Sequence, residues 1–510
     1  MQQLLYDGAR RTPDRPAFHW VDRDRTLTYG EAVEAMERVA GALASLGVER
    51  GDRVGVFAHN GMDYLLAMFG AWRLGAIAAL VNVQYADRLD YYVNDCSPKV
   101  LVYTGTHQEA IDHHRSQLQS IRQYVCMDGP AEGALSWAEL LESAPAPPPD
   151  RTEETDVAHL SYTSGTTGDP KGACLAHEPT MRATRCIAER LRIQASDVSL
   201  GPTALSSSYH LVANLLPGLH RGAEVCVLST WEPERGWDAL EGLGATILAA
   251  NPTFLRDTLD VSRQRGRPPG NLRIGLSGGA PVPVELKLAW RDELGVPLAE
   301  SFGMSELGGF VGLGSPDPVV EEKAPACGQP LPDKEVRILD DDGREVPVGT
   351  VGEICVRGGY MVGYWERSEK TAETLRGGWL HTGDVGYVDA EQFVFVRGRL
   401  AERLRVSGEY WYPRDVEEAV MRHSGVREAA LIGLPDPELG DRPVVYVTLR
   451  EGPVGSAEVV KFAEAELGRD LPGLSVEAVD AMPMTPTGKI SKAQLKAQAG
   501  AQVATPSGPA

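Results

Sequence analysis

Apolar and polar positions follow two periods along this chain. Between residues 155 and 303, short apolar or β-branched runs such as 156–162, 223–228 and 245–251 alternate with longer stretches in which apolar residues recur every three or four positions. The short runs are typical of buried strands, and the longer stretches are typical of amphipathic helices. This alternation predicts a parallel sheet covered by helices. The segment 28–103 has the same character.

The pattern changes in the last third of the chain. Residues 334–347 predict a β-hairpin with Asp342-Gly343 at its turn. Beyond Gly398, strand and helix patterns of a small α+β unit follow. We therefore predict an α/β fold with a large N-terminal domain of parallel-rich sheets covered by helices, residues 1–398, and a small α+β C-terminal domain, residues 399–496. The polar tail 497–510 is expected to be disordered.

Composition narrows the class of protein. The 510 residues carry a formal net charge of −21 and no run of lysine or arginine, which argues against a nucleic-acid partner. Arg73 interrupts the most apolar stretch, 65–83, so we expect a buried helix and strand there and no membrane partner. The start of the chain lacks the apolar core of a signal peptide. Seven dispersed cysteines without a CxxC motif indicate reduced thiols, so we expect a cytoplasmic protein.

The first candidate for chemistry is the segment YTSGTTGDPKGA, residues 162–173. Glycine, serine, threonine and proline also form ordinary surface turns. However, glycines let backbone N–H groups converge on phosphate oxygens, and hydroxyls and a lysine add further donors. The spacing differs from the Walker pattern. The segment alone leaves a plain turn and a polyphosphate site open.

Four further segments add candidate groups. Glu306 lies in a glycine-rich turn after a strand, where a carboxylate can bind Mg²⁺. Asp384 lies in a tight turn between Gly383 and Gly386, where it can accept hydrogen bonds from a ribose diol or cap its own backbone. The segment 396–413 follows, and Lys489 then lies in a loop before a helix. Singly, each of these residues has an ordinary structural explanation.

Together, in this order and at this wide spacing, the five segments resemble the adenylate-forming superfamily. This superfamily contains the acyl-CoA synthetases, the adenylation domains of nonribosomal peptide synthetases and the firefly luciferases. The resemblance covers nearly all of the chain from residue 27 to the loop with Lys489. It implies a large domain that carries most of the nucleotide site and a mobile small domain that moves over it, with a hinge just after Gly398-Arg399.

The resemblance also implies a role for each matching residue. Lys171 and the loop before it should bind the β- and γ-phosphates of ATP; the loop residues are Thr163, Ser164, Gly165, Thr166, Thr167 and Gly168. The adenine should be lined by Gly279, Ala280, Ser301, Phe302 and Gly303. Ser305, where the family usually has threonine, should contact the α-phosphate, and Glu306 should bind Mg²⁺. Asp384 should bind the ribose hydroxyls with Arg399 nearby, and Lys489 should bridge the attacking oxyanion and the α-phosphate. The substrate pocket should include Ser207, His210 and Gly278.

The expected chemistry follows from charge. An oxyanion that attacks a phosphate is repelled, and Mg²⁺ together with lysines neutralises the charge that develops. No general base is needed because the nucleophile is already ionised. The expected products are the AMP adduct of a small oxyacid and pyrophosphate, and a nucleophilic acceptor, with CoA as the first candidate, then takes the activated group.

Three positions depart from the family pattern. An aromatic residue followed by histidine is usual at the start of one helix, but the usual spacing falls on Ser206-Ser207, and the nearby Tyr209-His210 is shifted. The hinge position, usually Asp or Lys, is Ala401. The loop after Gly408, residues 409–412, is unusually aromatic for a loop that faces the pantetheine arm in CoA ligases. The resemblance therefore supports the adenylation step more strongly than the transfer to CoA.

Four functions follow as alternatives. The first is a CoA ligase for a small aryl or unsaturated acid. The second resembles the ATP-dependent diazotases of the superfamily, which activate nitrite for an aryl amine. The third is a serine hydrolase, because residues 275–279 match GxSxG around Ser277, although the next residues delay the helix that such a motif requires. The fourth is a nucleotide-binding module without catalysis, against which Glu306 and Lys489 argue.

Overall fold

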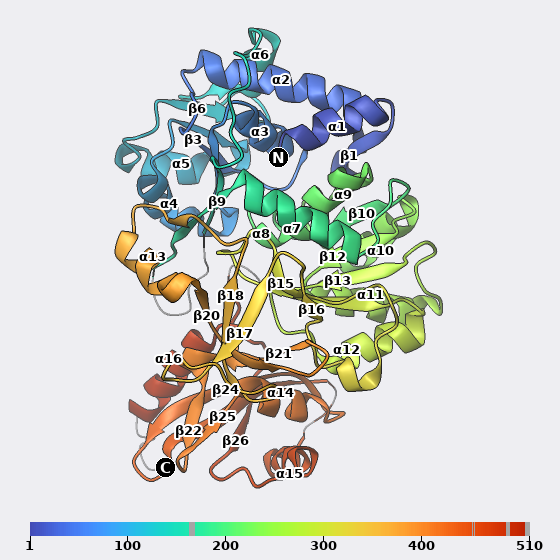
Figure 1. Cartoon of the computed structure of the whole chain (residues 1–510), viewed down its shortest axis with the longest axis vertical. Coiled ribbons are helices and arrows are strands. Elements are labelled where there is room, and N and C mark those ends of the chain that lie inside the picture. The colour runs from blue at the N-terminus through green and yellow to red at the C-terminus, as the bar shows by residue number, and fades with distance from the viewer. Residues whose placement is uncertain (163–168, 451, 453, 486–489, 505–510) are drawn as a thin grey trace.

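The fold consists of a large N-terminal part and a small C-terminal part, stacked along the long axis of the molecule (Figure 1). The computed structural model describes residues 1–162, 169–450, 452, 454–485 and 490–504, and all counts of elements below refer to these residues. The candidate residues Thr163–Gly168 and Lys489 therefore lie outside the described residues.

The first large sheet has nine strands in the order β16-β15-β14-β13-β12-β10-β11-β1-β2. Its strands from β14 to β1 in this order run parallel, and β2, β15 and β16 join antiparallel at the edges. The bounds are β1 Pro16–Trp20, β2 Arg25–Thr28, β10 Val198–Gly201, β11 Glu224–Val227, β12 Ile247–Ala250, β13 Ile274–Ser277, β14 Leu298–Gly303, β15 Phe310–Leu313 and β16 Gln329–Pro330.

The second large sheet has eight strands in the order β19-β9-β8-β4-β3-β5-β6-β7. The strands from β8 to β7 in this order are parallel, while β9 and β19 pair antiparallel. The bounds are β3 Arg53–Phe57, β4 Ile77–Leu80, β5 Val100–Tyr103, β6 Gln123–Cys126, β7 Leu135–Ser136, β8 Val157–Tyr162, β9 Gly172–Ala176 and β19 Gly363–Tyr364. Both sheets confirm the predicted parallel-rich α/β fold.

Helices cover these sheets and supply the main core. Their bounds are α1 Gln3–Arg11, α2 Tyr29–Ser45, α3 Met62–Arg73, α4 Leu89–Cys96, α5 Gln108–His114, α6 Trp137–Glu142, α7 His177–Arg190, α8 Ser208–His210, α9 Leu216–Arg221, α10 Pro233–Gly242, α11 Pro252–Arg265, α12 Val284–Ala289 and α13 Ser368–Thr374. A capping box of Thr28 and Glu31 starts α2, because each side chain satisfies a backbone N–H that the first turn leaves open. Helix α3 is buried almost all round, and Arg73 at its end is paired with Glu37 at 2.7 Å. The apolar stretch 65–83 is therefore a buried helix and the strand β4, as predicted.

A four-stranded antiparallel sheet, β17-β18-β20-β21, leads to the small part. Its bounds are β17 Glu335–Leu339, β18 Gly352–Arg357, β20 Leu380–Val388 and β21 Val394–Arg399. The hairpin predicted at 334–347 is present in reduced form. After β17, only Leu339 and Glu345 form a bridge, and Gly343 takes a positive φ of 78° at the turn.

The small part is an α+β unit with its own core. Its sheet contains β22 Leu404–Val406, β23 Glu409–Trp411, β24 Val426–Asp436, β25 Gly440–Leu449 and β26 Ser475–Ala478, and its helices are α14 Pro413–Met421, α15 Ser456–Leu467 and α16 Lys492–Ala504. Alternate residues of β24 face opposite sides, so that Leu431 packs in the cluster with α14 and α15, whereas Ile432 packs with Leu495 of α16.

Two other features bear on the sequence predictions. Helix α16 extends to Ala504, so it includes part of the tail for which we expected disorder; residues 505–510 lie outside the described residues. In the part of the chain that the structure describes, no helix has the length and apolarity needed to cross a membrane.

Candidate active site

Lys171 lies at the antiparallel end of the second large sheet, where β8, β9 and β19 are neighbours. It directly precedes β9, which pairs with both β8 and β19. Its ammonium nitrogen lies 5.0 Å from the centroid of the Tyr364 ring, a cation–π arrangement. The loop that the sequence assigns to phosphate binding connects β8 to Lys171, so its end is anchored beside Tyr364.

Glu306 contacts the hydroxyl of the same tyrosine. The Tyr364 hydroxyl donates a hydrogen bond of 2.6 Å to Oε1 of Glu306, and both side chains are buried. Burial and the Glu306 charge raise the pKa of Tyr364, so its proton stays available for this bond. The Met361 N–H also donates to the Glu306 carbonyl at 2.7 Å. A cation and a carboxylate from distant segments are thereby fixed around one ring.

The Glu306 carboxylate fits a hard divalent cation. Among the described residues, only one of its two oxygens accepts a hydrogen bond, so the other can act as an oxygen ligand of the kind Mg²⁺ prefers. Glu306 would hold Mg²⁺, which when bound neutralises phosphate charge.

Asp384 and Arg399 form a neighbouring pair across β20 and β21. The two residues are directly opposite in the strand register, and Nε of Arg399 lies 3.1 Å from Oδ1 of Asp384. The Arg399 charge partly opposes the rise in the pKa of Tyr364, so this pair acts electrostatically on the Lys171–Tyr364–Glu306 group. The structure thus brings together four of the residues that the sequence assigned to nucleotide binding.

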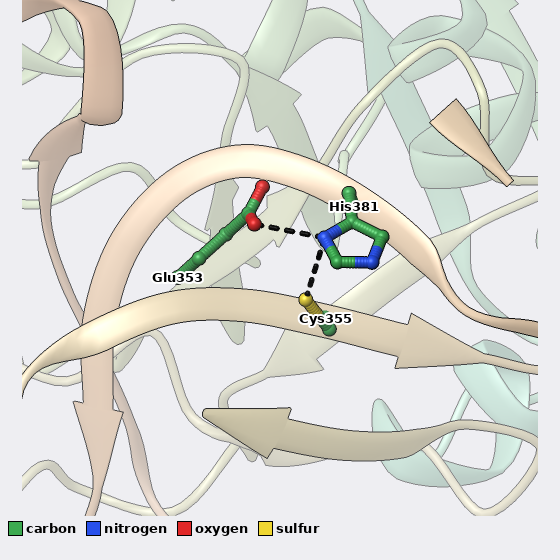
Figure 2. Close-up of side chains that lie close together, drawn as sticks. All are labelled: Glu353, Cys355 and His381. Carbon is green, nitrogen blue, oxygen red and sulfur yellow. Dashed lines mark hydrogen bonds and ion pairs between the residues drawn. The ribbon is translucent and has the colours of Figure 1, made fainter. Parts of the chain in front are cut away.

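The tight turn predicted around Asp384 is instead an irregular stretch of the strand β20, and three neighbouring side chains support it (Figure 2). Glu353 on β18 accepts hydrogen bonds from the Gly383 N–H at 3.1 Å and from His381 Nδ1 at 2.8 Å. The Cys355 sulfur lies 3.3 Å from the same imidazole nitrogen, and burial raises the pKa of its thiol to about 12. Cys355 therefore stays protonated, and the histidine nitrogen beside it is already hydrogen-bonded to Glu353, so this thiol is not activated as a nucleophile. The carboxylate oxygen of Glu353, the sulfur of Cys355 and the imidazole nitrogen of His381 lie within 4.8 Å of one another, and the group holds β18 against β20 at Gly383.

The residues assigned to the adenine and the acid meet at the ends of β13 and β14. Ser301 Oγ donates to the Ser277 carbonyl at 3.0 Å. A Cβ at Gly278 would lie 2.2 Å from Ser301 Oγ and 2.7 Å from the Tyr209 ring, so only glycine fits here. Gly279 follows with φ of +77° and is exposed. Gly278 is therefore buried against Ser301 and Tyr209, whereas the backbone at Gly279 has open space beside it that a ligand can approach closely.

Ser207, Tyr209 and His210, the residues at or near the usual aromatic–histidine position, have different environments in the structure. Ser207 is the N-cap of α8, and its hydroxyl accepts from the Tyr209 N–H at 3.3 Å. His210 is fully buried, with Nδ1 2.7 Å from the Thr203 carbonyl and Nε2 3.3 Å from Asn214, and burial lowers its pKa to about 4. It is a neutral support of the helix. Tyr209 is the member that faces Gly278, with its hydroxyl donating to the Leu276 carbonyl at 2.9 Å.

The remaining candidates lie at the edges of the site. Ser305 is half-buried one residue before Glu306, and Phe302 packs in the cluster that includes Leu307 and Ile338. Ala401 is exposed in the turn Leu400–Glu402 between the two parts. Gly408 lies at φ of +88° in the exposed β22–β23 turn.

Sequence reasoning missed Tyr364, which joins Lys171 to Glu306. A two-residue strand has no periodicity, so the only available signal was an aromatic residue after glycine in Gly363-Tyr364. The serine-hydrolase alternative is wrong. Ser277 is wholly buried in β13, and the next helix, α12, begins only at Val284.

The fold and the site together define a two-domain, nucleotide-activating enzyme. A family model described as AMP-binding enzyme matches residues 5–365, and its partner, the AMP-binding enzyme C-terminal domain, matches residues 415–489. The chain belongs to this AMP-binding, adenylate-forming family, and it is an ATP-dependent, AMP-forming enzyme of the acyl-CoA ligase type.

Individual relatives resemble it over nearly their full length. A feruloyl-CoA synthase from Amycolatopsis sp is 32% identical, covering 93% of this chain and 94% of the relative. The structure of the anthranilate CoA ligase AuaEII in complex with anthranoyl-AMP superposes with a TM-score of 0.92 at 25% identity, over 99% of this chain and 98% of that one. The amide bond synthetase McbA from Marinactinospora thermotolerans gives a TM-score of 0.86 at 25% identity, over 98% of both chains.

Proposed function

We propose that this enzyme activates a small aryl or unsaturated carboxylic acid as its AMP adduct, with release of pyrophosphate, and transfers the acyl group to CoA. The observation that carries the adenylation step is the fixed group of Lys171, Tyr364 and Glu306. It places a cation and an oxygen ligand on the same tyrosine, and both kinds of group serve the attack of a carboxylate on a phosphate.

The remaining residues take the roles that their positions support. Asp384, held by Arg399, accepts from the ribose hydroxyls, and the exposed backbone at Gly279 is proposed to lie against the adenine, with the buried Gly278 and Tyr209 behind the acid. The carboxylate oxygen of the acid attacks the α-phosphorus, the bond to the bridging oxygen breaks, and pyrophosphate leaves with the electron pair. Lys489 is proposed to neutralise the charge that develops in this step.

An aromatic acid is supported by the side chains near Gly278. The ring of Tyr209 lies 6.0 Å from that of Phe310, and its hydroxyl is anchored on the Leu276 carbonyl. This gives a rigid apolar ring face beside a glycine backbone, against which a flat acid can stack. A feruloyl-CoA synthase and an anthranilate CoA ligase among the similar proteins agree with this class of acid.

CoA is proposed as the acceptor because the similar proteins include a feruloyl-CoA synthase and an anthranilate CoA ligase. An aryl amine is the second candidate. His210 is neutral and enclosed, and Ala401 offers no polar side chain at the junction of the two parts. Both features suit a diazotase-like reaction in which nitrite is activated and an aryl amine attacks. The similar amide bond synthetase shows that this fold also occurs in an enzyme named for forming amide bonds.

Product analysis distinguishes the two candidates. The enzyme is incubated with ATP and Mg²⁺ in two arms, one with CoA and a panel of aryl and unsaturated acids, the other with nitrite and aryl amines. Acid-dependent pyrophosphate release and an acyl-CoA mass support the CoA ligase. Pyrophosphate release that needs nitrite and is unaffected by CoA would overturn it in favour of the diazotase-like reaction. Glu306→Gln is the matched control that should suppress either reaction.

A substitution at Gly408 does not test CoA binding cleanly. Because its φ of +88° disfavours any side chain, Gly408→Leu would strain the turn whether or not CoA passes it. Tyr410→Ala is a better probe of the acceptor, since Tyr410 is exposed and lies under the Arg403 guanidinium at 3.9 Å. Thioester formation should fall in this variant while acid-dependent pyrophosphate release persists.

A further inference from the structure

A hollow at the junction of the large and small parts is lined by four arginines. It has a volume of about 110 Å³. Its walls come from α11, from the region of α12 and from the small part, and its lining residues include Arg256, Arg263, Arg427 and Arg450. A wider depression that shares Asp260, Arg427 and Arg450 continues from it. Figure 1 shows α11 and α12 on the side of the large part that faces α14 and the small sheet.

The acidic residues in the hollow already have partners. Asp260 lies 3.3 Å from Arg263, whose guanidinium also binds both oxygens of Glu293 at 2.7 and 2.6 Å. Glu285 lies 3.2 Å from Arg422. The nearby Glu428 accepts a hydrogen bond from the Thr448 hydroxyl at 3.0 Å. Asp260 and Glu285 each have an arginine partner and Glu428 accepts a hydrogen bond, so part of the negative charge around the hollow is already neutralised.

Three of the arginines are left without an ion pair among the residues that the structure describes: Arg256, Arg427 and Arg450. Arg256 is half-buried. Burial and the charges of Arg450 and Arg427 lower its pKa, and the charges of Glu428 and Asp260 oppose this only in part. Like charges held together in a partly desolvated space repel one another. The arrangement is unfavourable unless an anion joins it.

The size and donor chemistry indicate which anion. At about 30 Å³ per water, the hollow has room for a few waters or one tetrahedral oxyanion. Guanidinium groups bind phosphate through paired N–H donors. The rest of the chain is strongly acidic, with a net charge of −21, so a local excess of arginine is not a general property of this surface.

We propose that Arg256, Arg427 and Arg450 form a binding site for a phosphoryl group at the junction of the two domains, separate from the nucleotide site. Because Arg256 belongs to the large domain and the other two to the small domain, the anion bridges them and stabilises their present arrangement. The phosphoryl group comes either from free inorganic phosphate or from a larger phosphorylated ligand.

Calorimetric titration tests the site directly. The active site is first filled with α,β-methylene-ATP and Mg²⁺, and inorganic phosphate or adenosine 3′,5′-bisphosphate is then titrated in separate arms. We expect saturable binding with one site per chain in at least one arm. Each of Arg256→Gln and Arg427→Gln should weaken it about tenfold or more, as expected for a charge-assisted hydrogen bond. Tighter binding of the bisphosphate identifies a larger ligand as the source, and equal or tighter binding of phosphate identifies the free anion.

Matched variants keep the test decisive. Arg427 is exposed, so its substitution should not affect folding. Arg405→Gln, an exposed arginine of β22 outside the hollow, should bind both probes like the wild type. Absence of saturable binding in both wild-type arms, or unchanged binding in an Arg256→Gln/Arg427→Gln double variant, would overturn the proposal. These readouts use no acid, CoA or nitrite, so they do not depend on the proposed reaction.

Discussion

The contact between the two domains rests on a buried arginine whose removal should loosen it measurably. The side chain of Arg414 on α14 is only 7% exposed, and its guanidinium lies 3.6 Å from Glu300 Oε1 on β14. The same group donates to the Val282 carbonyl at 3.4 Å, and its Nε binds Glu418 at 2.6 Å within α14. Lys287 also contacts Glu300. Arg414 therefore ties the small domain to the strand whose end carries Ser301.

The chain offers a matched control on the same face. Arg422, just past α14, pairs with Glu285 of α12 at 3.2 Å, but the two side chains are 40% and 43% exposed. Both ion pairs cross the same junction, and each arginine has a second carboxylate partner in the small domain, Glu418 for Arg414 and Glu466 for Arg422, so burial is the main contrast between them. A hydrogen bond to a charged group contributes about 1.5–3 kcal/mol, and the long contacts of Arg414 place it near the lower figure. An exposed pair contributes about 0–1 kcal/mol.

Hydrogen–deuterium exchange of the segment 282–286 measures the difference. Val282 accepts from Arg414 and Glu285 pairs with Arg422, so this segment carries both contacts and its amides should exchange faster when the domains separate. Arg414→Met should speed their exchange about tenfold, since 1.4 kcal/mol corresponds to a factor of ten. Arg422→Gln should change it by less than about fivefold, and its effect should shrink further at high salt. Equal effects of the two variants, or none from Arg414→Met, would refute the reasoning that burial makes Arg414 the stronger tie.

Four further predictions concern the site and the core. Asp384→Ala should weaken ATP binding by about 1.5–3 kcal/mol in calorimetry, because it loses charge-assisted hydrogen bonds; wild-type affinity would contradict its role. Lys489→Ala should lower turnover by about 10²–10³ while ATP binds within a few-fold of wild type; unchanged turnover would rule out the assigned role. Tyr364→Phe and Glu306→Gln should couple in a double-mutant cycle on kcat/KM, with Tyr29→Phe as the uncoupled control, and strict additivity would show that their hydrogen bond is irrelevant to activity. Burial lowers the pKa of His159 from 6.5 to about 4, so between these pH values the unfolded state binds more protons than the folded state. The free energy of unfolding should therefore fall as pH falls through this window, by roughly 3 kcal/mol at the acid end. Urea unfolding of His159→Gln should show a shallower decline with pH, and an unchanged slope would contradict this.

The class of fold could be predicted from the sequence because it depends on local periodicity. Runs such as 156–162 and 245–251 are β8 and β12, and the amphipathic stretch after Thr28 is α2. A strand or helix must bury one face wherever it packs, so neighbouring residues in the sequence show the alternation of apolar and polar positions that predicts it. The same is true of Asp384 and Glu306, whose glycine-rich surroundings marked them as candidates before any contact was known.

Tertiary structure alone decided which of these residues meet and which are enclosed. Tyr364 is 58 residues from Glu306 in sequence, and only the pairing of β19 with β9 brings its hydroxyl to that carboxylate and its ring to Lys171. His210 looked like a candidate for the substrate pocket, but the packing of α8 encloses it and turns Tyr209 toward Gly278 instead. Side-chain direction and burial arise from contacts across the whole fold, and a linear pattern contains no record of them.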